Sequence, residues 1–135
     1  TAANMSYQLS YKWYTHPDFA QYADGTKRIQ NDSRAFIQSL GYAYDEKTNT
    51  YRGIKPNEKR IALFAHEGAG MAFLSSVLGI PYPMFCTHFG LQHSGVSVIR
   101  FDGEAHVIPQ LLQLSNDSHL YKDGLPLCYN DEIRI

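Results

Sequence analysis

The chain has 135 residues, of which 44% are hydrophobic and 13% aromatic, enough to bury the core of one globular domain. Its 12 Lys and Arg against 13 Asp and Glu leave a net charge of -1, and no stretch concentrates one sign, which excludes nucleic-acid binding through a basic face. Every apolar run is far shorter than the roughly 20 residues that span a bilayer, so no membrane partner is expected. Cys86 and Cys128 do not form a C-x-x-C pair, which indicates free thiols and a reducing compartment, by default the cytoplasm.

The first part of the chain is predicted to contain two helices and a hairpin. The aromatic-rich segment from residue 5 is expected to form a short helix up to about Thr15, followed by a loop that includes the turn at residues 24–25. Residues 26–40 carry apolar side chains at helical spacing, which predicts an amphipathic helix with Thr26 as its N-cap and Gly41 as its stop. Residues 42–44 and 50–52 flank a polar loop, a pattern typical of a β-hairpin.

The centre of the chain is a continuous apolar run, residues 61–65, followed by small residues. Such a run predicts a central strand buried on both faces in a parallel sheet. Residues 66–70 read His-Glu-Gly-Ala-Gly, and the apolar residues after them fall at helical spacing until Gly79 and Pro81. Strand, turn and helix in this order form half of a βαβ unit.

The C-terminal part is predicted to add a connecting element and a second hairpin. Pro81 opens a short turn or helix, and residues 95–101 and 105–114 are expected to pair as antiparallel strands across Asp102-Gly103. A loop or short helix should follow residues 116–118. These elements predict a single α/β domain over residues 1–135, with a mostly parallel sheet and one antiparallel hairpin.

His66 is the sharpest candidate for chemistry, because it lies at the carboxyl end of the predicted central strand and just before a helix. Open α/β sheets bind ligands at that edge, and a helix N-terminus presents free N–H groups and partial positive charge. An anion such as phosphate is the expected guest. His66 could donate a hydrogen bond to it or stabilise a transferring phosphoryl group; a purely structural role as helix cap is the alternative. Glu67 could donate a proton or simply favour the helix dipole.

Other known motifs do not match this part of the sequence. Gly70 occupies the position where the zinc-protease signature H-E-x-x-H requires its second histidine. Residues 68–72 lack the Lys and Ser or Thr of a phosphate-binding Walker loop. Cys86, His88 and His93 match no common zinc spacing, so no metal and no cofactor are expected.

Residues 61–81, 95–103 and 114–120 resemble the C-terminal half of the histidine phosphatase family, which includes the cofactor-dependent phosphoglycerate mutases. Upstream, residues 13–17, 24–26 and Arg34 look like the region that precedes the second catalytic histidine there. The resemblance implies a three-layer α/β/α fold and chemistry through a phosphohistidine. His66 matches the second histidine, and Gly68 matches the residue whose N–H binds phosphate. Glu67 stands where the family usually has glycine, which brings a carboxylate close to the anion.

The family's nucleophile, a histidine in an Arg-His-Gly motif, is absent: none of the 6 histidines follows an arginine. In the family it lies far upstream of the second histidine. Because the chain also opens at Thr1 rather than Met, the sequence is expected to be the C-terminal part of a larger histidine phosphatase domain. The implied partners are the missing N-terminal segment of the same protein and a phosphorylated small molecule or phosphoprotein.

The expected function is therefore that of a phosphomonoesterase or phosphomutase, with the present chain alone inactive. Two other functions remain open. One is a degenerate, non-catalytic relative that binds a phosphorylated ligand or a protein, which Glu67 favours. The other is a small independent α/β binding module without phosphate chemistry.

Overall fold

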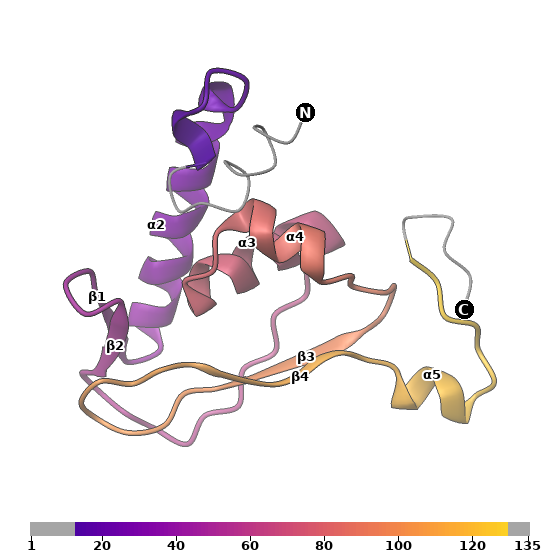
Figure 1. The fold of residues 1–135 in the computed structure, drawn as a ribbon. Coiled ribbons are helices and arrows are strands. Elements are labelled where there is room, and N and C mark those ends of the chain that lie inside the picture. The colour runs from indigo at the N-terminus through magenta and orange to yellow at the C-terminus, as the bar shows by residue number, and fades with distance from the viewer. Residues whose placement is uncertain (1–12, 130–135) are drawn as a thin grey trace.

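The computed structural model describes residues 13–129, and the predictions for residues 1–12 and 130–135 lie outside them. Helices and strands are both present, so the predicted combination of α and β structure is confirmed at that level. The helices α2, α3 and α4 lie together on one side of a long hairpin, and α5 stands at its far end (Figure 1). The elements in chain order are η1 (Trp13–Thr15), η2 (Ala20–Tyr22), α2 (Ala23–Ser39), β1 (Tyr42–Asp45), β2 (Thr50–Gly53), α3 (Glu67–Leu78), α4 (Tyr82–His88), β3 (Val96–Arg100), β4 (Gln110–Asn116) and α5 (Ser118–Lys122).

Helix α2 confirms the predicted amphipathic helix but begins earlier. Its N-cap is Tyr22, not Thr26, because the 3-10 turn η2 leads directly into it and takes the predicted turn at residues 24–25 into the helix. Ser33 and Ile37, one turn apart, are its buried residues. The helix ends at Ser39 with Leu40 as its C-cap, and the next residue, Gly41, has a φ of 105° that favours glycine.

The hairpin of β1 and β2 has the predicted segments. Tyr42 pairs with Gly53, Tyr44 with Tyr51, and Asp45 with Thr50. In the loop the Lys47 N–H donates to Asp45 Oδ1 at 2.9 Å, and Asn49 takes a positive φ of 54°. Arg34 of α2 lies over the Tyr44 ring, 3.8 Å from its centroid, and also pairs with Glu46 at 3.1 Å. These contacts fix the hairpin against α2.

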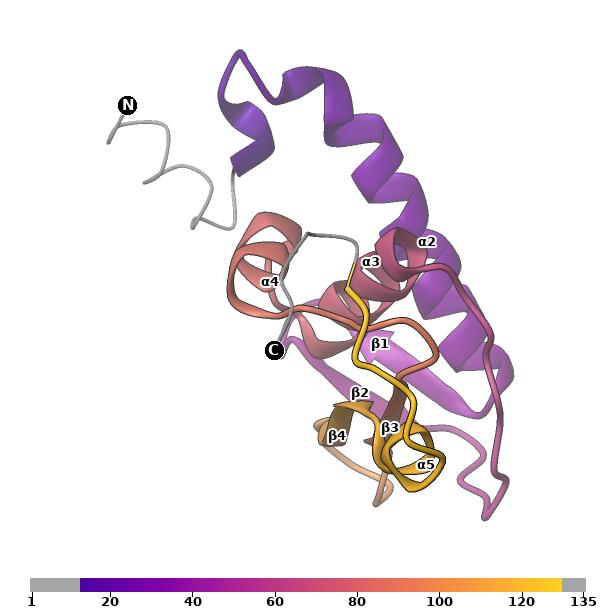
Figure 2. The same ribbon diagram turned by 90° about the vertical axis from the view of Figure 1, so that its right-hand side faces the viewer.

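Residues 61–65 do not form the predicted buried central strand, and that prediction is wrong for this chain. Ile61, Leu63 and Phe64 are exposed, Phe64 to 92%. The segment runs apart from β3 and β4 in the side view (Figure 2). A continuous apolar run is a buried strand only when neighbouring strands and helices cover it, and within residues 13–129 no strand pairs with it.

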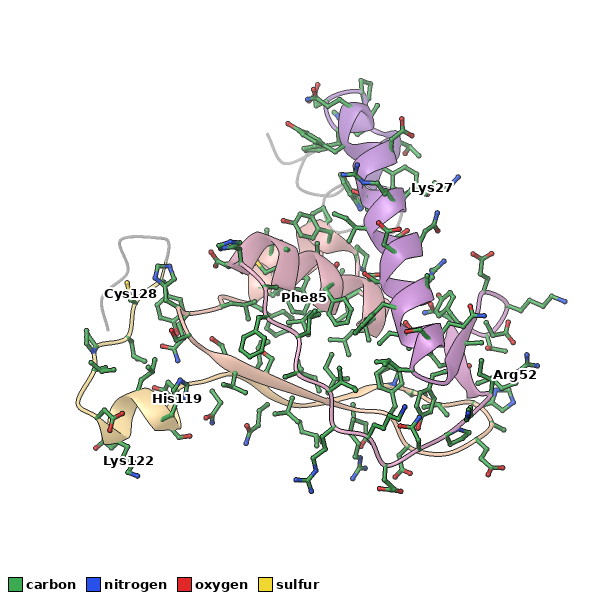
Figure 3. All side chains as sticks on the ribbon, turned by 180° about the vertical axis from the view of Figure 1, so that it is seen from behind. Lys27, Arg52, Phe85, His119, Lys122 and Cys128 are labelled. Carbon is green, nitrogen blue, oxygen red and sulfur yellow. The ribbon has the colours of Figure 1, made fainter. Side chains whose placement is uncertain are left out.

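Helix α3 follows this segment as predicted and is the most buried helix. Gly79 ends it in the left-handed conformation, and the Gly79 N–H bonds to Ser75 and Ser76 carbonyls. The predicted connecting element after Pro81 is α4. Its Phe85 is fully buried and points into the packing below the helices (Figure 3).

Strands β3 and β4 are antiparallel, which confirms the predicted second hairpin, but their connection differs. Val96 pairs with Asn116 and Arg100 with Gln110, with register irregularities around Val98. The strands do not close tightly at Asp102-Gly103, because Val107 turns away to pair with Tyr51. The two backbones exchange N–H···O bonds of 2.8 and 2.7 Å.

The core joins the two hairpins to the helices. One buried cluster contains Ile37, Tyr42, Tyr51, Val77 and Val107, and a second contains Met71, Leu74 and Phe85; Ile99 of β3 packs against both. In the described part of the chain, pairing is confined to two small antiparallel sheets. The predicted mostly parallel sheet is therefore corrected for residues 13–129.

Among the described residues, no single helix is long and apolar enough to cross a membrane; α3 and α4 pass that test only as a pair bent by 118°.

Candidate functional site

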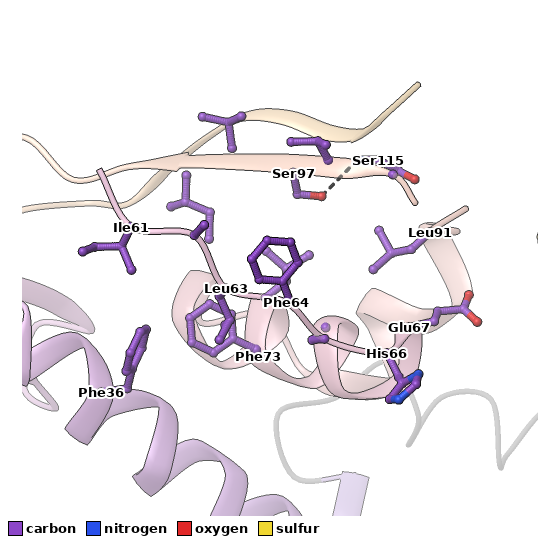
Figure 4. Close-up of a pocket in the computed structure, with 18 of the residues that line it drawn as sticks. Phe36, Ile61, Leu63, Phe64, His66, Glu67, Phe73, Leu91, Ser97 and Ser115 are labelled. Carbon is purple, nitrogen blue, oxygen red and sulfur yellow. Dashed lines mark hydrogen bonds between the residues drawn. The ribbon is translucent and has the colours of Figure 1, made fainter. Parts of the chain in front are cut away.

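A wide groove of about 1220 Å³ opens between the helices and β3. Its walls are the inner face of α2, the segment that leads into α3, the first turns of α3, and the edge of β3. The floor and walls near α2 are apolar, with Phe36, Leu63 and Phe73 among them, whereas the end near α3 carries polar side chains (Figure 4).

The polar end is built on the N-terminus of α3. His66 is the N-cap, with φ of -69° and ψ of 158°, and its side chain makes no capping hydrogen bond. The helix proper closes with the Gly70 N–H donating to the His66 carbonyl at 2.8 Å. N–H groups in a first helical turn have no acceptor within their helix. The imidazole is exposed and lines the groove, so it is available to a guest there.

Gly68 and Glu67 lie beside His66, as the sequence predicts. Apart from its chain neighbours and its own helix backbone, no atom comes within 4 Å of the position that a Cβ on Gly68 would take, so the space on that side of Gly68 is open. Glu67 is half-buried and is also among the residues that line the groove. The three residues therefore lie together at one end of the groove, and the side chains of His66 and Glu67 point in different directions there (Figure 4).

The structure adds two histidines that the sequence analysis did not assign to this site. His93 and His119 both line the same groove, although they come from a loop and from α5. Motif spacing could not have found them, because they reach this groove only through the three-dimensional fold. His88 and Cys86, considered as metal ligands with His93, lie on α4 and do not line the groove. Across residues 13–129, no group of three or more His, Cys, Asp and Glu side chains is placed to hold a metal ion.

Hydrogen bonds among Gln92, Ser97 and Ser115 connect the groove wall to β4. The Gln92 N–H donates to Ser115 Oγ at 2.8 Å and Gln92 Nε2 donates to the Ser115 carbonyl at 3.1 Å, while the Ser115 N–H donates to Ser97 Oγ at 3.0 Å. Ser115 has a positive φ of 51°. Gln92 is only 6% exposed, yet its Oε1 has no hydrogen-bond partner in the described structure. A buried acceptor without a donor is uncommon and costly.

Cys86, whose thiol interacts with the charge of Glu67, is a poor nucleophile. Burial raises the pKa of the Cys86 thiol, and a hydrogen bond to Cys86 together with burial raises the pKa of Tyr82 to about 12. Because thiolate is the reactive form, Cys86 is held in its unreactive thiol form. The groove itself is lined by His66, Glu67, His93 and His119.

Comparison with protein-family models, with curated proteins and with solved structures found no match.

Proposed function

We propose that this chain is the C-terminal part of a phosphomonoesterase or phosphomutase that acts through a phosphohistidine, and that His66 and Gly68 form part of its phosphate site. The carrying observation is that His66, the uncovered Gly68 and the first turn of α3 line one end of a single groove. Backbone N–H groups at a helix start and a histidine that can be protonated are complementary to an oxyanion. The resemblance to histidine phosphatases supports the same assignment.

In this proposal each group has a role that matches its chemistry. Gly68 offers its N–H to a phosphate oxygen, and His66 donates a hydrogen bond to the phosphoryl group as charge develops on it. The phosphoryl-accepting histidine would come from a segment outside the 135 residues, because the sequence contains no Arg-His-Gly. Glu67 would protonate the leaving oxygen in this proposal.

The fold proposed for the longer polypeptide is the three-layer α/β/α arrangement with a mostly parallel sheet. This fold is supported by residues 61–65, which are all apolar and yet are exposed in the described structure. A run of this kind is stable when strands flank it and helices cover both faces. The partners proposed are this additional segment and a phosphorylated small molecule or phosphoprotein.

Glu67 also favours a second function, a non-catalytic relative that binds a phosphorylated ligand or a protein. A carboxylate next to an anion site weakens phosphate binding unless it is protonated or turned away. Glu67 lines the same groove as His66, so this repulsion acts at the site itself. In such a relative Gly68 and His66 would hold the ligand without transferring it.

An NMR titration of the 135-residue chain with inorganic phosphate tests the anion site. We expect the His66 ring and Gly68 amide signals to shift together at millimolar phosphate, with tighter binding at pH 6 than at pH 8, because imidazoles gain positive charge as the pH falls. His66→Ala should weaken binding by about tenfold, the loss of one charge-assisted hydrogen bond. Glu67→Gln should strengthen it.

His88→Ala is the matched control, since His88 is an exposed histidine on α4 away from the groove. It should leave phosphate binding unchanged. If His66 and Gly68 signals stay fixed up to tens of millimolar phosphate, or if binding tightens as the pH rises, the anion site is wrongly assigned.

A further inference from the structure

The connection between β3 and β4 exposes an Asp-Gly pair, Asp102-Gly103, which does not form the predicted tight turn. Both residues are exposed, and the Asp102 carboxylate lies 4.0 Å from Arg100 Nη2. Within residues 13–129 the Gly103 N–H makes no hydrogen bond. Apart from the chain neighbours of Gly103, the nearest atom to a Cβ built on it belongs to Val107, at 3.8 Å. The amide beside this aspartate is therefore unbonded and has open space around it.

An aspartate followed by glycine can react with the next backbone amide. The glycine nitrogen bonds to the aspartate Cγ, and the amide hydrogen leaves with the hydroxyl of the protonated carboxyl as water, which closes a succinimide ring. Water then opens the ring. Addition at Cγ restores aspartate, whereas addition at the former backbone carbonyl yields isoaspartate, whose main chain runs through Cβ and Cγ and is one methylene longer. Glycine favours the first step because it has no Cβ to hinder the attack.

The chain contains two further Asp-Gly pairs, Asp24-Gly25 and Asp123-Gly124, and the fold holds both of their amides. Both aspartates are exposed. The first pair lies within α2, so its ring could close only after that end of the helix unwinds. In the second pair the Gly124 N–H donates to the Tyr121 carbonyl at 3.1 Å, and this hydrogen bond must open before the nitrogen can attack. The same dipeptide thus occurs in three different backbone environments.

We propose that Asp102 is a covalent modification site, at which the folded chain forms isoaspartate faster than at its two other Asp-Gly pairs. The selectivity comes from the amide and not from the side chain, because all three aspartates are exposed and the Gly103 N–H is the one without a hydrogen bond or a helix to hold it in the described range. The reaction consumes and returns one water molecule and needs no other reactant.

Isoaspartate at residue 102 acts on the joint between the two hairpins, because the β3–β4 connection lies beside β2 (Figure 1). The Glu104 carbonyl accepts a hydrogen bond from the Gly53 N–H at 2.7 Å, and Val107 exchanges two with Tyr51, at 2.8 and 2.7 Å. The packing there is close: a Cβ on Gly53 would lie 3.0 Å from the Gly103 carbonyl oxygen and 3.1 Å from Glu104 Cα. An added methylene just before these contacts shifts them and loosens the pairing with β2.

Incubation of the folded 135-residue chain in water enriched in oxygen-18 tests the site, because each opening of a succinimide inserts one solvent oxygen. Trypsin, used afterwards in ordinary water, places the three pairs on separate peptides, residues 13–27, 101–122 and 123–134. After the same time at neutral pH we expect roughly tenfold more label at Asp102 than at Asp24 or Asp123, the factor that one opened hydrogen bond implies. Fragmentation of the peptides should locate both the label and isoaspartate at residue 102.

Urea is the control for the effect of the fold. In the unfolded chain all three amides are equally accessible, so the three pairs should gain label at similar rates. Asp102→Glu is the control for the chemistry, since glutamate would have to close a larger ring, and residue 102 should then stay unlabelled. Equal labelling of the three pairs in the folded chain, or faster labelling at Asp24 or Asp123, would overturn the assignment. Selectivity that persists in urea would also overturn it, because neighbouring side chains and not the fold would then be the cause.

Hydrogen exchange tests the effect on the joint. In the isoaspartate-containing fraction, separated by chromatography, the amides of Tyr51, Gly53 and Val107 should exchange about tenfold faster than in the unmodified chain. Asp102→Glu after the same incubation should match a fresh sample. Unchanged exchange in the modified fraction would show that the connection absorbs the methylene and would overturn the link to the hairpins. Neither measurement involves phosphate, so both outcomes are independent of the proposed function.

Discussion

Tyr51 is a core residue of the first hairpin whose ring and hydroxyl make different contributions to stability. Its ring is 1% exposed and packs against Tyr44 and Phe101 with centroid distances of 5.2 and 5.3 Å. Its hydroxyl has no hydrogen-bond partner in the described structure. Burial raises the pKa of Tyr51 to about 12, although the nearby Arg34 charge acts in the opposite direction. The residue therefore resists ionisation and contributes through its ring.

Tyr51→Phe should keep or raise stability at pH 7, by up to about 1 kcal/mol, because it removes an unpaired buried hydroxyl. The effect grows at high pH. Tyrosine in the unfolded chain ionises near pH 10 and folded Tyr51 near pH 12, so its contribution to stability is complete below pH 10 and is lost as the pH rises through 12. Thermal melts at pH 7 and pH 11 measure both effects.

Tyr82→Phe is the comparison for that series. The pKa of Tyr82 is also raised to about 12, but its largest cause is the hydrogen bond with Cys86, which phenylalanine removes. Tyr82→Phe should therefore lower the melting temperature at pH 7, where Tyr51→Phe does not. A fall in melting temperature for Tyr51→Phe at pH 7 would show that its hydroxyl has a partner after all.

At the scale of elements, the junction of α2 with the first hairpin depends on Gly41. Its φ of 105° is open only to glycine at low energy, and a Cβ there would overlap the Lys55 carbonyl. The Gly41 carbonyl also accepts hydrogen bonds from the Ile54 and Lys55 N–H groups, at 2.8 and 3.0 Å. Gly41 thus stops α2 and fixes the residues that follow β2.

Gly41→Ala should destabilise the chain by about 2 kcal/mol or more, through backbone strain and the steric overlap. Gly25→Ala is the opposite control: Gly25 lies within α2 and has open space around it, so alanine should stabilise the helix by about 0.5–1 kcal/mol. Urea unfolding of both variants gives the two signs. Equal effects would mean that helix propensity, rather than the junction, controls stability.

The elements that could be predicted from the sequence are those with local causes. Gly41 and Gly79 end α2 and α3 as expected, because a left-handed residue is a local requirement. The two hairpins follow from alternating segments around polar turns. Val107 could not be placed, since its pairing with Tyr51 depends on the distant packing of both hairpins. The early start of α2 was missed because η2 feeds into it.

In the candidate site, too, the features with local causes could be predicted and those that depend on distant packing could not. His66, Glu67 and Gly68 are consecutive and precede a clear helix, so their proximity could be predicted. His93 and His119 line the same groove only because of the three-dimensional fold: His93 lies in the loop before β3 and His119 on α5 (Figure 3 labels His119). Residues 61–65 were expected to be buried because their composition describes a protected strand; composition does not say which polypeptide segment provides the protection.

At the scale of the whole molecule, the 135-residue chain should have negligible phosphatase activity. None of its histidines follows an arginine, and loss of a nucleophile lowers the rate by many orders of magnitude. Assay of the purified chain with p-nitrophenyl phosphate should give the buffer rate, with His66→Ala no different. Turnover that His66→Ala abolishes would show that His66 itself accepts the phosphoryl group or activates water.

The exposed run at residues 61–65 also has a consequence for solubility during synthesis. Five adjacent apolar residues without charge or proline form the kind of segment that recruits identical chains into cross-β aggregates. The charges that could oppose this stand immediately outside it, Lys59 and Arg60 before and Glu67 after. Charged residues that flank an apolar run in this way act as gatekeepers, which oppose the association of identical chains.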